Sequence, residues 1–230
     1  MKPCKIEKMD VNNYEWLLDK ADPALAFQVQ RDMLGADDKK LWDLQNRIAR
    51  NGIGGTLLEK RKSDGHWGNG VYNPKWTCTH YVLFELVQLG IAPDIRECGE
   101  SASLLLGFPI GKDGGINYAR TVEYSDVCIN GMILNIVSYF GIVDSRVKAV
   151  VDFLLSVQME DGGWNCEYCH GARMRDALSI IMAGLSRRGF VGSSSQPGKV
   201  YPDVKSLTDA RKWNTLRALR VAKKYGAYLP

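Results

Sequence analysis

The sequence predicts an all-helical protein built from stacked copies of one helical unit. Three segments share a pattern in which a glycine-containing turn leads through a polar loop into an amphipathic helix that ends at another glycine. From first to last glycine the copies span 65–90, 115–141 and 163–189, spacings of 25, 26 and 26 residues. A nearly constant spacing of this kind is typical of stacked supersecondary units. Each unit buries its apolar helix face against its neighbours.

Apolar periodicity predicts helices along most of the chain, and strand-like alternation is nearly absent. Asp22 before Pro23 marks the start of the first helix, and Gly52, Gly54 and Gly55 are expected to separate the second helix from the third. The expected helices are 23–34, 37–49, 56–62, 77–89, 93–106, 126–140, 143–159, 174–185 and 206–226. A loop is expected at 191–205, where serine, proline and glycine gather.

Length and composition favour one domain over residues 1–230, with a repeat core at about 56–189. The chain has 30 basic and 26 acidic residues in mixed order, which argues against a nucleic-acid protein. The charged N-terminus has no apolar stretch behind it, so we expect no secretory signal. No apolar run has the length of a spanning helix. We therefore expect a cytoplasmic protein with no membrane span, whose six cysteines are reduced.

The turn 158–164, with the sequence Gln-Met-Glu-Asp-Gly-Gly-Trp, resembles the Gln-Trp repeat of squalene cyclases and of protein prenyltransferase β subunits. Segments 64–67 and 112–116 are degenerate copies of it. The resemblance covers roughly 56–185 and implies an α/α toroid, closed or partial, in which inner helices surround a central cavity. In that pattern Trp67 and Trp164 tie the end of one helix to the start of the next and are expected to be buried. The chain is short for a full toroid, so the ring is either partial or completed by a second chain.

Alignment on the closing glycines places Thr77, Cys128 and Asp176 at equivalent positions, 13 residues before each glycine. In a toroid these first-turn residues meet at one end of the cavity, where helix N-termini lower the pKa of thiols and carboxyls. Asp176 is a candidate catalytic group, and a capping role is the alternative. His80 lies one turn after Thr77 and is a candidate general base, or else a buried core histidine. The residues expected to line the substrate cavity are Trp76, Thr77, Tyr81 and Trp213.

Asp126 and Cys128 resemble the Asp-x-Cys pair of zinc ligands in protein prenyltransferase β subunits, although no histidine stands where that family has its third ligand. Cys166, Cys169 and His170 offer the sulfur and nitrogen ligands that Zn²⁺ prefers. The sequence 169–171 also resembles the Cys-His-Gly zinc element of lanthionine cyclases. We expect these five residues to hold zinc, the alternative being buried thiols or a thiol pair.

Two functions follow from these expectations. One is a prenyltransferase-like or terpene cyclase-like enzyme that acts on an isoprenoid or another apolar substrate in the cavity. The other is a non-catalytic toroid module that holds a small apolar ligand or a partner protein, with a homo-oligomer as a further expectation. The Asp-x-Asp-Asp motif with which class II terpene cyclases protonate their substrate does not occur, so cyclisation by protonation is not expected.

Overall fold

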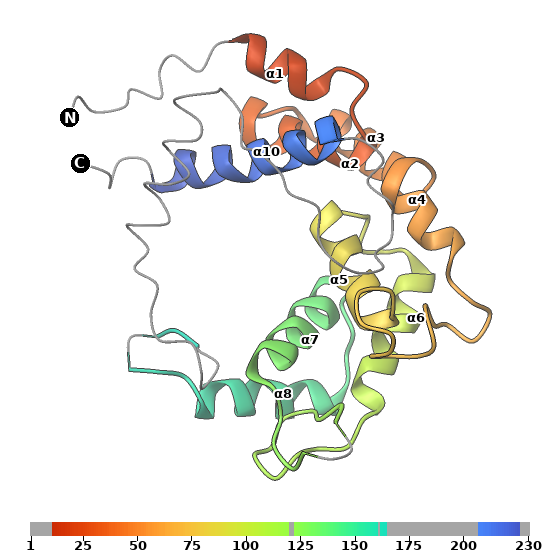
Figure 1. The fold of residues 1–230 in the computed structure, drawn as a ribbon, viewed down its shortest axis with the longest axis vertical. Coiled ribbons are helices and arrows are strands. Elements are labelled where there is room, and N and C mark those ends of the chain that lie inside the picture. The colour runs from red at the N-terminus through yellow and green to blue at the C-terminus, as the bar shows by residue number, and fades with distance from the viewer. Residues whose placement is uncertain (1–10, 120–121, 161, 165–206, 226–230) are drawn as a thin grey trace. The chain divides into compact units, whose positions relative to one another are not determined.

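The computed structural model describes residues 11–119, 122–160, 162–164 and 207–225 (Figure 1). All regular elements in these ranges are helices, apart from an isolated antiparallel bridge between Ile110 and Ile116. The prediction of an all-helical fold is confirmed. Within the described ranges, no helix has both the length and the apolar character needed to cross a bilayer.

The chain divides into two compact units. The described parts of the first are 11–53 and 207–225, and those of the second are 54–119, 122–160 and 162–164. The single toroidal domain stays a prediction.

The first unit contains helices from both ends of the described chain. They are α1 (Val11–Leu18), α2 (Pro23–Val29), the π-helical turn η2 (Gln30–Leu34), α3 (Asp38–Ile48) and α10 (Leu207–Tyr225). Leu17, Leu25 and Val29 form a buried cluster with Leu216 and Leu219 of α10. This apolar contact, rather than sequence proximity, places α10 in the first unit.

Helix α4 (Gly52–Glu59) differs from the prediction, because it begins four residues before the expected start. Glycine is a poor helix former, but Gly54 and Gly55 are buried inside this helix. The Asp22 carboxylate both caps α2, by accepting from Ala24 N at 2.8 Å, and accepts from Ile53 N at 2.7 Å. A Cβ at Gly52 would collide with that carboxylate, and the backbone there has a φ of 64°. Gly54 and Gly55 are therefore part of the helix, and their expected place in the break is wrong, whereas Gly52 lies at the break between α3 and α4 as expected.

The second unit carries the repeats. Its further helices are α5 (Thr79–Leu89), α6 (Arg96–Leu104) with the short 3-10 turn η3 (Leu105–Gly107), α7 (Val127–Tyr139) and α8 (Ser145–Ser156). Helix α7 packs against α5, α6 and α8 (Figure 1). The α-helices lie within the ranges that the sequence predicts for them, so their predicted positions along the chain are confirmed up to α8.

The three predicted turns have the same backbone hydrogen bonds, counted from Trp67, Ile116 and Trp164. The amide five positions before each of these residues donates to the carbonyl just before it: Lys62 N to His66 O at 2.9 Å, Gly111 N to Gly115 O at 2.8 Å and Met159 N to Gly163 O at 3.0 Å. The glycine two positions before each has a positive φ: 83° at Gly65, 90° at Gly114 and 81° at Gly162. Glycine adopts this conformation without steric cost. The turns are therefore copies of one another with these three glycines as equivalents, so the predicted equivalence of Gly115 and Gly163 with Gly65 is wrong by one residue.

The closing glycines are also equivalent. Gly90 directly follows α5 and has a φ of 80°. Gly141 stands 51 positions later, just beyond the end of α7, and has a φ of 63°. After each of them an isoleucine amide reaches back five residues, Ile91 N to Leu86 O at 3.2 Å and Ile142 N to Val137 O at 2.9 Å. This is the Schellman pattern of helix ends. The register of 51 residues therefore relates α5 to α7 residue by residue.

The tryptophan junctions agree with the prediction in their hydrogen bonds but not in burial. The indole of Trp67 donates to Leu57 O at 2.6 Å, and that of Trp164 donates to Leu154 O at 2.7 Å. Trp67 is fully buried, whereas Trp164 is 49% exposed. The expectation that Trp164 is a buried staple is therefore wrong, because its ring forms one wall of an open pocket.

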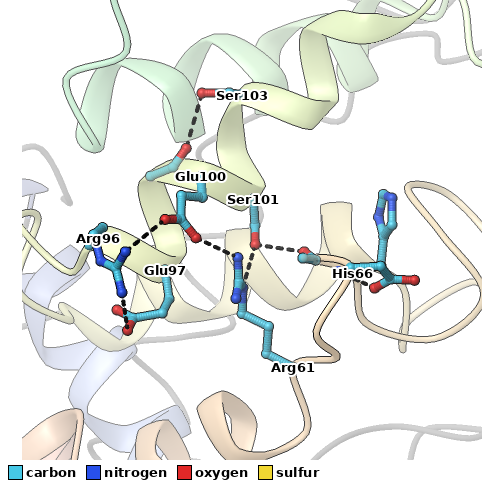
Figure 2. A network of polar contacts seen from close by, with 10 residues as sticks. Arg61, His66, Arg96, Glu97, Glu100, Ser101 and Ser103 are labelled. Carbon is cyan, nitrogen blue, oxygen red and sulfur yellow. Dashed lines mark hydrogen bonds and ion pairs between the residues drawn. The ribbon is translucent and has the colours of Figure 1, made fainter.

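A polar network joins the first turn to α6. Figure 2 shows the Arg61 guanidinium between Glu100 and Ser101, with Nε donating to Ser101 Oγ at 2.8 Å and Nη2 donating to Glu100 at 3.0 Å. The buried Ser101 hydroxyl donates in turn to Gly65 O at 2.6 Å. The network satisfies polar groups that would be costly to bury alone and fixes the turn that precedes Trp67.

Candidate functional site

The predicted site residues fall into three groups. Trp76, Thr77, His80, Tyr81, Asp126 and Cys128 belong to the second unit. Trp213 belongs to the first unit, where it is partly buried against the Leu17 and Leu216 cluster. Asp176, Cys166, Cys169 and His170 lie outside the described residues.

An aromatic cluster surrounds His80 at the start of α5. The His80 ring meets Tyr72, Tyr81 and Tyr118 edge to face, with centroid distances of 5.7, 5.1 and 5.6 Å. Trp76 continues the cluster outward through Tyr81, at 4.8 Å. Edge-to-face pairs of this spacing are favourable beyond simple burial. The structure therefore brings together three of the predicted residues.

His80 is fully buried, and its Nε2 has no hydrogen-bond partner among the described residues. The other ring nitrogen, Nδ1, lies 3.4 Å from the Tyr118 hydroxyl. Burial lowers the pKa of His80 to about 4. The imidazole is therefore neutral at pH 7, and in this state one ring nitrogen accepts a hydrogen bond.

Tyr72 and Tyr118 are not among the site residues predicted from the sequence. Each follows the hydrophobic residue of a repeat turn, Tyr72 after Trp67 and Tyr118 after Ile116. The Tyr72 and Tyr81 hydroxyls lie 3.2 Å apart, and desolvation raises the pKa of both. The sequence could have indicated these residues only through the aromatic residue that follows each turn. Their contact with His80 depends on the path of the loops, which the sequence does not show.

Thr77 and Trp76 differ in exposure although they are neighbours. Thr77 is buried, and Trp76 is 47% exposed with a φ of 73°. A left-handed backbone is uncommon for a residue with a large side chain. The two consecutive side chains therefore have different surroundings: Trp76 is half exposed to solvent, and Thr77 lies in the core.

Asp126 and Cys128 stand at the start of α7. Asp126 occupies the N-cap position, but its side chain makes no capping hydrogen bond. Its charge contributes to the raised pKa of Tyr72, as does Cys128. The start of α7 therefore adjoins the aromatic cluster, with a carboxylate that does not cap the helix.

An apolar pocket of about 450 Å³ opens between α7 and α8. The described residues that line it are Val127, Cys128, Gly131, Leu134, Val151, Leu154, Leu155 and Trp164. None of these described residues is charged, and among them only Cys128 has a reactive side chain. A pocket of this size and character falls in the range of small-molecule sites.

The 51-residue register relates the pocket lining on α7 to the preceding repeat. The α7 positions Val127, Gly131 and Leu134 correspond to Trp76, His80 and Leu83 of that repeat. His80 and Leu83 are fully buried there. Glycine in place of histidine removes a whole side chain, and a Cβ added at Gly131 would meet no atom of the described residues within 4 Å. Among the described residues, the two central positions of this face are therefore packed in the first copy and open in the next.

The predicted zinc set is divided by the limits of the described chain. Asp126 and Cys128 are a carboxylate and a thiol, both suitable as zinc ligands. Among the described residues, no three His, Cys, Asp or Glu side chains come together in a way that could hold a metal ion. Cys166, Cys169 and His170 lie outside those residues, so the five-residue site stays a prediction.

Comparison with known proteins gives no match: no family model, no curated protein and no solved structure matches this chain.

Proposed function

We propose that the protein binds the apolar chain of an isoprenoid-like molecule in the pocket between α7 and α8. The observation that carries the proposal is the lining by the described residues, which is apolar apart from Cys128 and is hollowed at Gly131. Moving a CH₂ group from water into such surroundings contributes about 0.8 kcal/mol. The Trp164 ring, 49% exposed, supplies an aromatic wall that a bound chain would cover.

A prenyltransferase-like reaction is the enzymatic form of this proposal: a thiolate would form a bond to the first carbon of an isoprenoid diphosphate whose apolar chain lies in the pocket, and diphosphate would leave. Cys128 is the lining residue with chemistry of its own, and Asp126 precedes it by two positions. The family resemblance adds zinc, which these two residues would hold together with Cys166, Cys169 and His170. Bound zinc supplies a deprotonated, nucleophilic thiolate. The contribution of α7 is to place Cys128 in the pocket lining, two positions after Asp126, and the apolar lining would exclude water from the ligand chain. A reducing cytoplasm, as expected from the sequence, would keep Cys128 as a thiol.

A non-catalytic binding module is the second candidate, and the repeat register favours it. The positions that line the pocket on α7 are those at which the preceding repeat buries Thr77, His80 and Leu83. The pocket therefore occupies a helix face that the preceding repeat uses for packing. A face of this kind can hold a ligand by packing alone, without catalysis. Zinc analysis of protein purified without a histidine tag separates the candidates: about one zinc per chain supports the enzyme, and no zinc supports the module.

Calorimetric titration with farnesol, a neutral isoprenoid alcohol, tests the pocket. Gly131→Phe should fill the space and abolish binding. Gly131→Ala is the matched control, because a methyl group fits there and alanine favours the helix by about 1 kcal/mol over glycine. Binding that is lost in the first variant and kept in the second supports the proposal. No binding by the wild type, or equal binding by all three proteins, would reject it.

A further inference from the structure

A second feature of this unit is a group of aromatic side chains outside the lining of the apolar pocket, of which Trp76 is about half exposed. Trp76 contacts Tyr81 at a centroid distance of 4.8 Å, and Tyr81 stacks on Tyr72 at 5.7 Å with 28° between the ring planes. We call these three residues the aromatic platform. Trp76 is 47% exposed, and Tyr72 and Tyr81 are half-buried.

The backbone holds the platform in place at a conformational cost. The φ of Trp76 is 73°, a left-handed value that is a genuine outlier for a bulky side chain. The surrounding loop is fixed by Thr79 N donating to Gly70 O at 3.1 Å and His80 N donating to Val71 O at 3.0 Å. Residues held in such conformations occur often at ligand-binding sites.

The platform already carries a positive charge. The Lys75 ammonium lies over the Trp76 ring, with Nζ 4.8 Å from the ring centroid. The aromatic face is negative and attracts a cation at this distance. The Lys75 side chain thus shows that this face of the Trp76 ring is accessible to a cation.

The charges around the platform also favour a cation. The Asp126 carboxylate acts on the Tyr72 hydroxyl and helps to raise its pKa. His80, which packs edge to face against both tyrosines, has a pKa lowered to about 4 by burial and so carries no positive charge at pH 7. Lys75 itself is therefore the positive group that a ligand would replace.

We propose that the aromatic platform binds a small quaternary ammonium ion on the Trp76 face that Lys75 occupies. A quaternary ammonium is more weakly hydrated than the lysine ammonium, so it loses less solvation when it contacts a ring, and aromatic faces are a common means of recognising it. The platform residues are not among the described residues that line the pocket of the proposed function, so ligand binding at the two sites can be measured separately.

Titration with choline and with 3,3-dimethylbutan-1-ol tests the proposal, since the two molecules have nearly the same shape and differ in charge. Wild type should bind choline at least about tenfold more tightly than the neutral alcohol. Trp76→Ala should abolish choline binding. Lys75→Gln should strengthen it several-fold, because the internal competitor is gone. Circular dichroism of each variant verifies that it is folded.

Three results would overturn the proposal: equal affinity for the alcohol, choline binding that survives Trp76→Ala, or a Lys75→Gln variant with unchanged or weaker affinity. Tyr81→Leu is the second variant should Trp76→Ala fail to fold, and it too should lose choline. Farnesol binding measured on the same proteins keeps this outcome separate from that of the apolar pocket.

Discussion

The indole nitrogen of Trp67 lies 2.6 Å from the carbonyl oxygen of Leu57, ten residues earlier and two residues before the end of α4. Trp164 has the same relationship to Leu154, which stands two residues before the end of α8. A carbonyl near a helix C-terminus has no partner within the helix. The tryptophan of the next turn donates to this carbonyl in both copies and so ties the helix end to the turn, while Leu57 O also accepts from Lys60 N at 3.2 Å.

The two tryptophans should differ in their contribution to stability. Trp67→Ala should lower the free energy of unfolding by roughly 3–5 kcal/mol, because a buried aromatic ring and its hydrogen bond are lost. Trp164→Ala should cost about 1–2 kcal/mol, since half of that ring already contacts water. Equilibrium urea unfolding measures both values. Equal losses would show that Trp164 is buried after all.

His80 should make stability depend on pH. Its pKa falls from 6.5 in the unfolded chain to about 4 in the folded protein. Between these values the unfolded chain binds a proton that the folded protein excludes, so stability falls as pH falls, by at most about 1.4 kcal/mol per pH unit.

His80→Gln should reduce that dependence. Unfolding in urea at pH 7, 5.5 and 4.5 gives the comparison, and the difference between wild type and variant isolates His80 from the carboxylates. Parallel curves for the two proteins would mean that His80 is protonated as easily when folded as when unfolded.

The described cysteines should react with iodoacetamide at very different rates. Burial raises the pKa of Cys98 to about 12 and also raises that of Cys78, whereas Cys128 is exposed. Because the thiolate is the reactive form, peptide mass spectrometry after brief treatment at pH 8 should find Cys128 modified first. Treatment in urea should label all three. Native labelling of Cys98 as fast as Cys128 would contradict the burial.

The zinc prediction is tested by single substitutions. If Asp126, Cys128, Cys166, Cys169 and His170 share one ion, Cys128→Ser should reduce zinc content as strongly as Cys169→Ser, because losing any ligand opens the coordination shell. Zinc that is lost only in the Cys166, Cys169 and His170 variants would assign the metal to that segment alone. Wild-type protein without zinc would remove the site.

Helix positions and the register of the closing glycines Gly90 and Gly141 were predictable, because both depend on local periodicity. The turn glycines were placed one residue late in the second and third copies, because a Gly-Gly pair does not show which glycine has the positive φ. The helical role of Gly54 and Gly55 was not, since glycine's low propensity is overridden by burial. The cluster around His80 also needed the structure. Tyr72 and Tyr118 reach it from loops, and the left-handed backbone of Trp76 follows from no sequence pattern.

Photo-cross-linking with a diazirine analogue of farnesol tests the central claim most directly, because it locates the bound chain on the protein. We expect the labelled residues to lie in three places: 127–134, 151–155 and Trp164 with its neighbours. Excess farnesol and the Gly131→Phe substitution should suppress labelling, and Gly131→Ala should not. Labelling that is spread over other helices, or that neither farnesol nor Gly131→Phe suppresses, would contradict it.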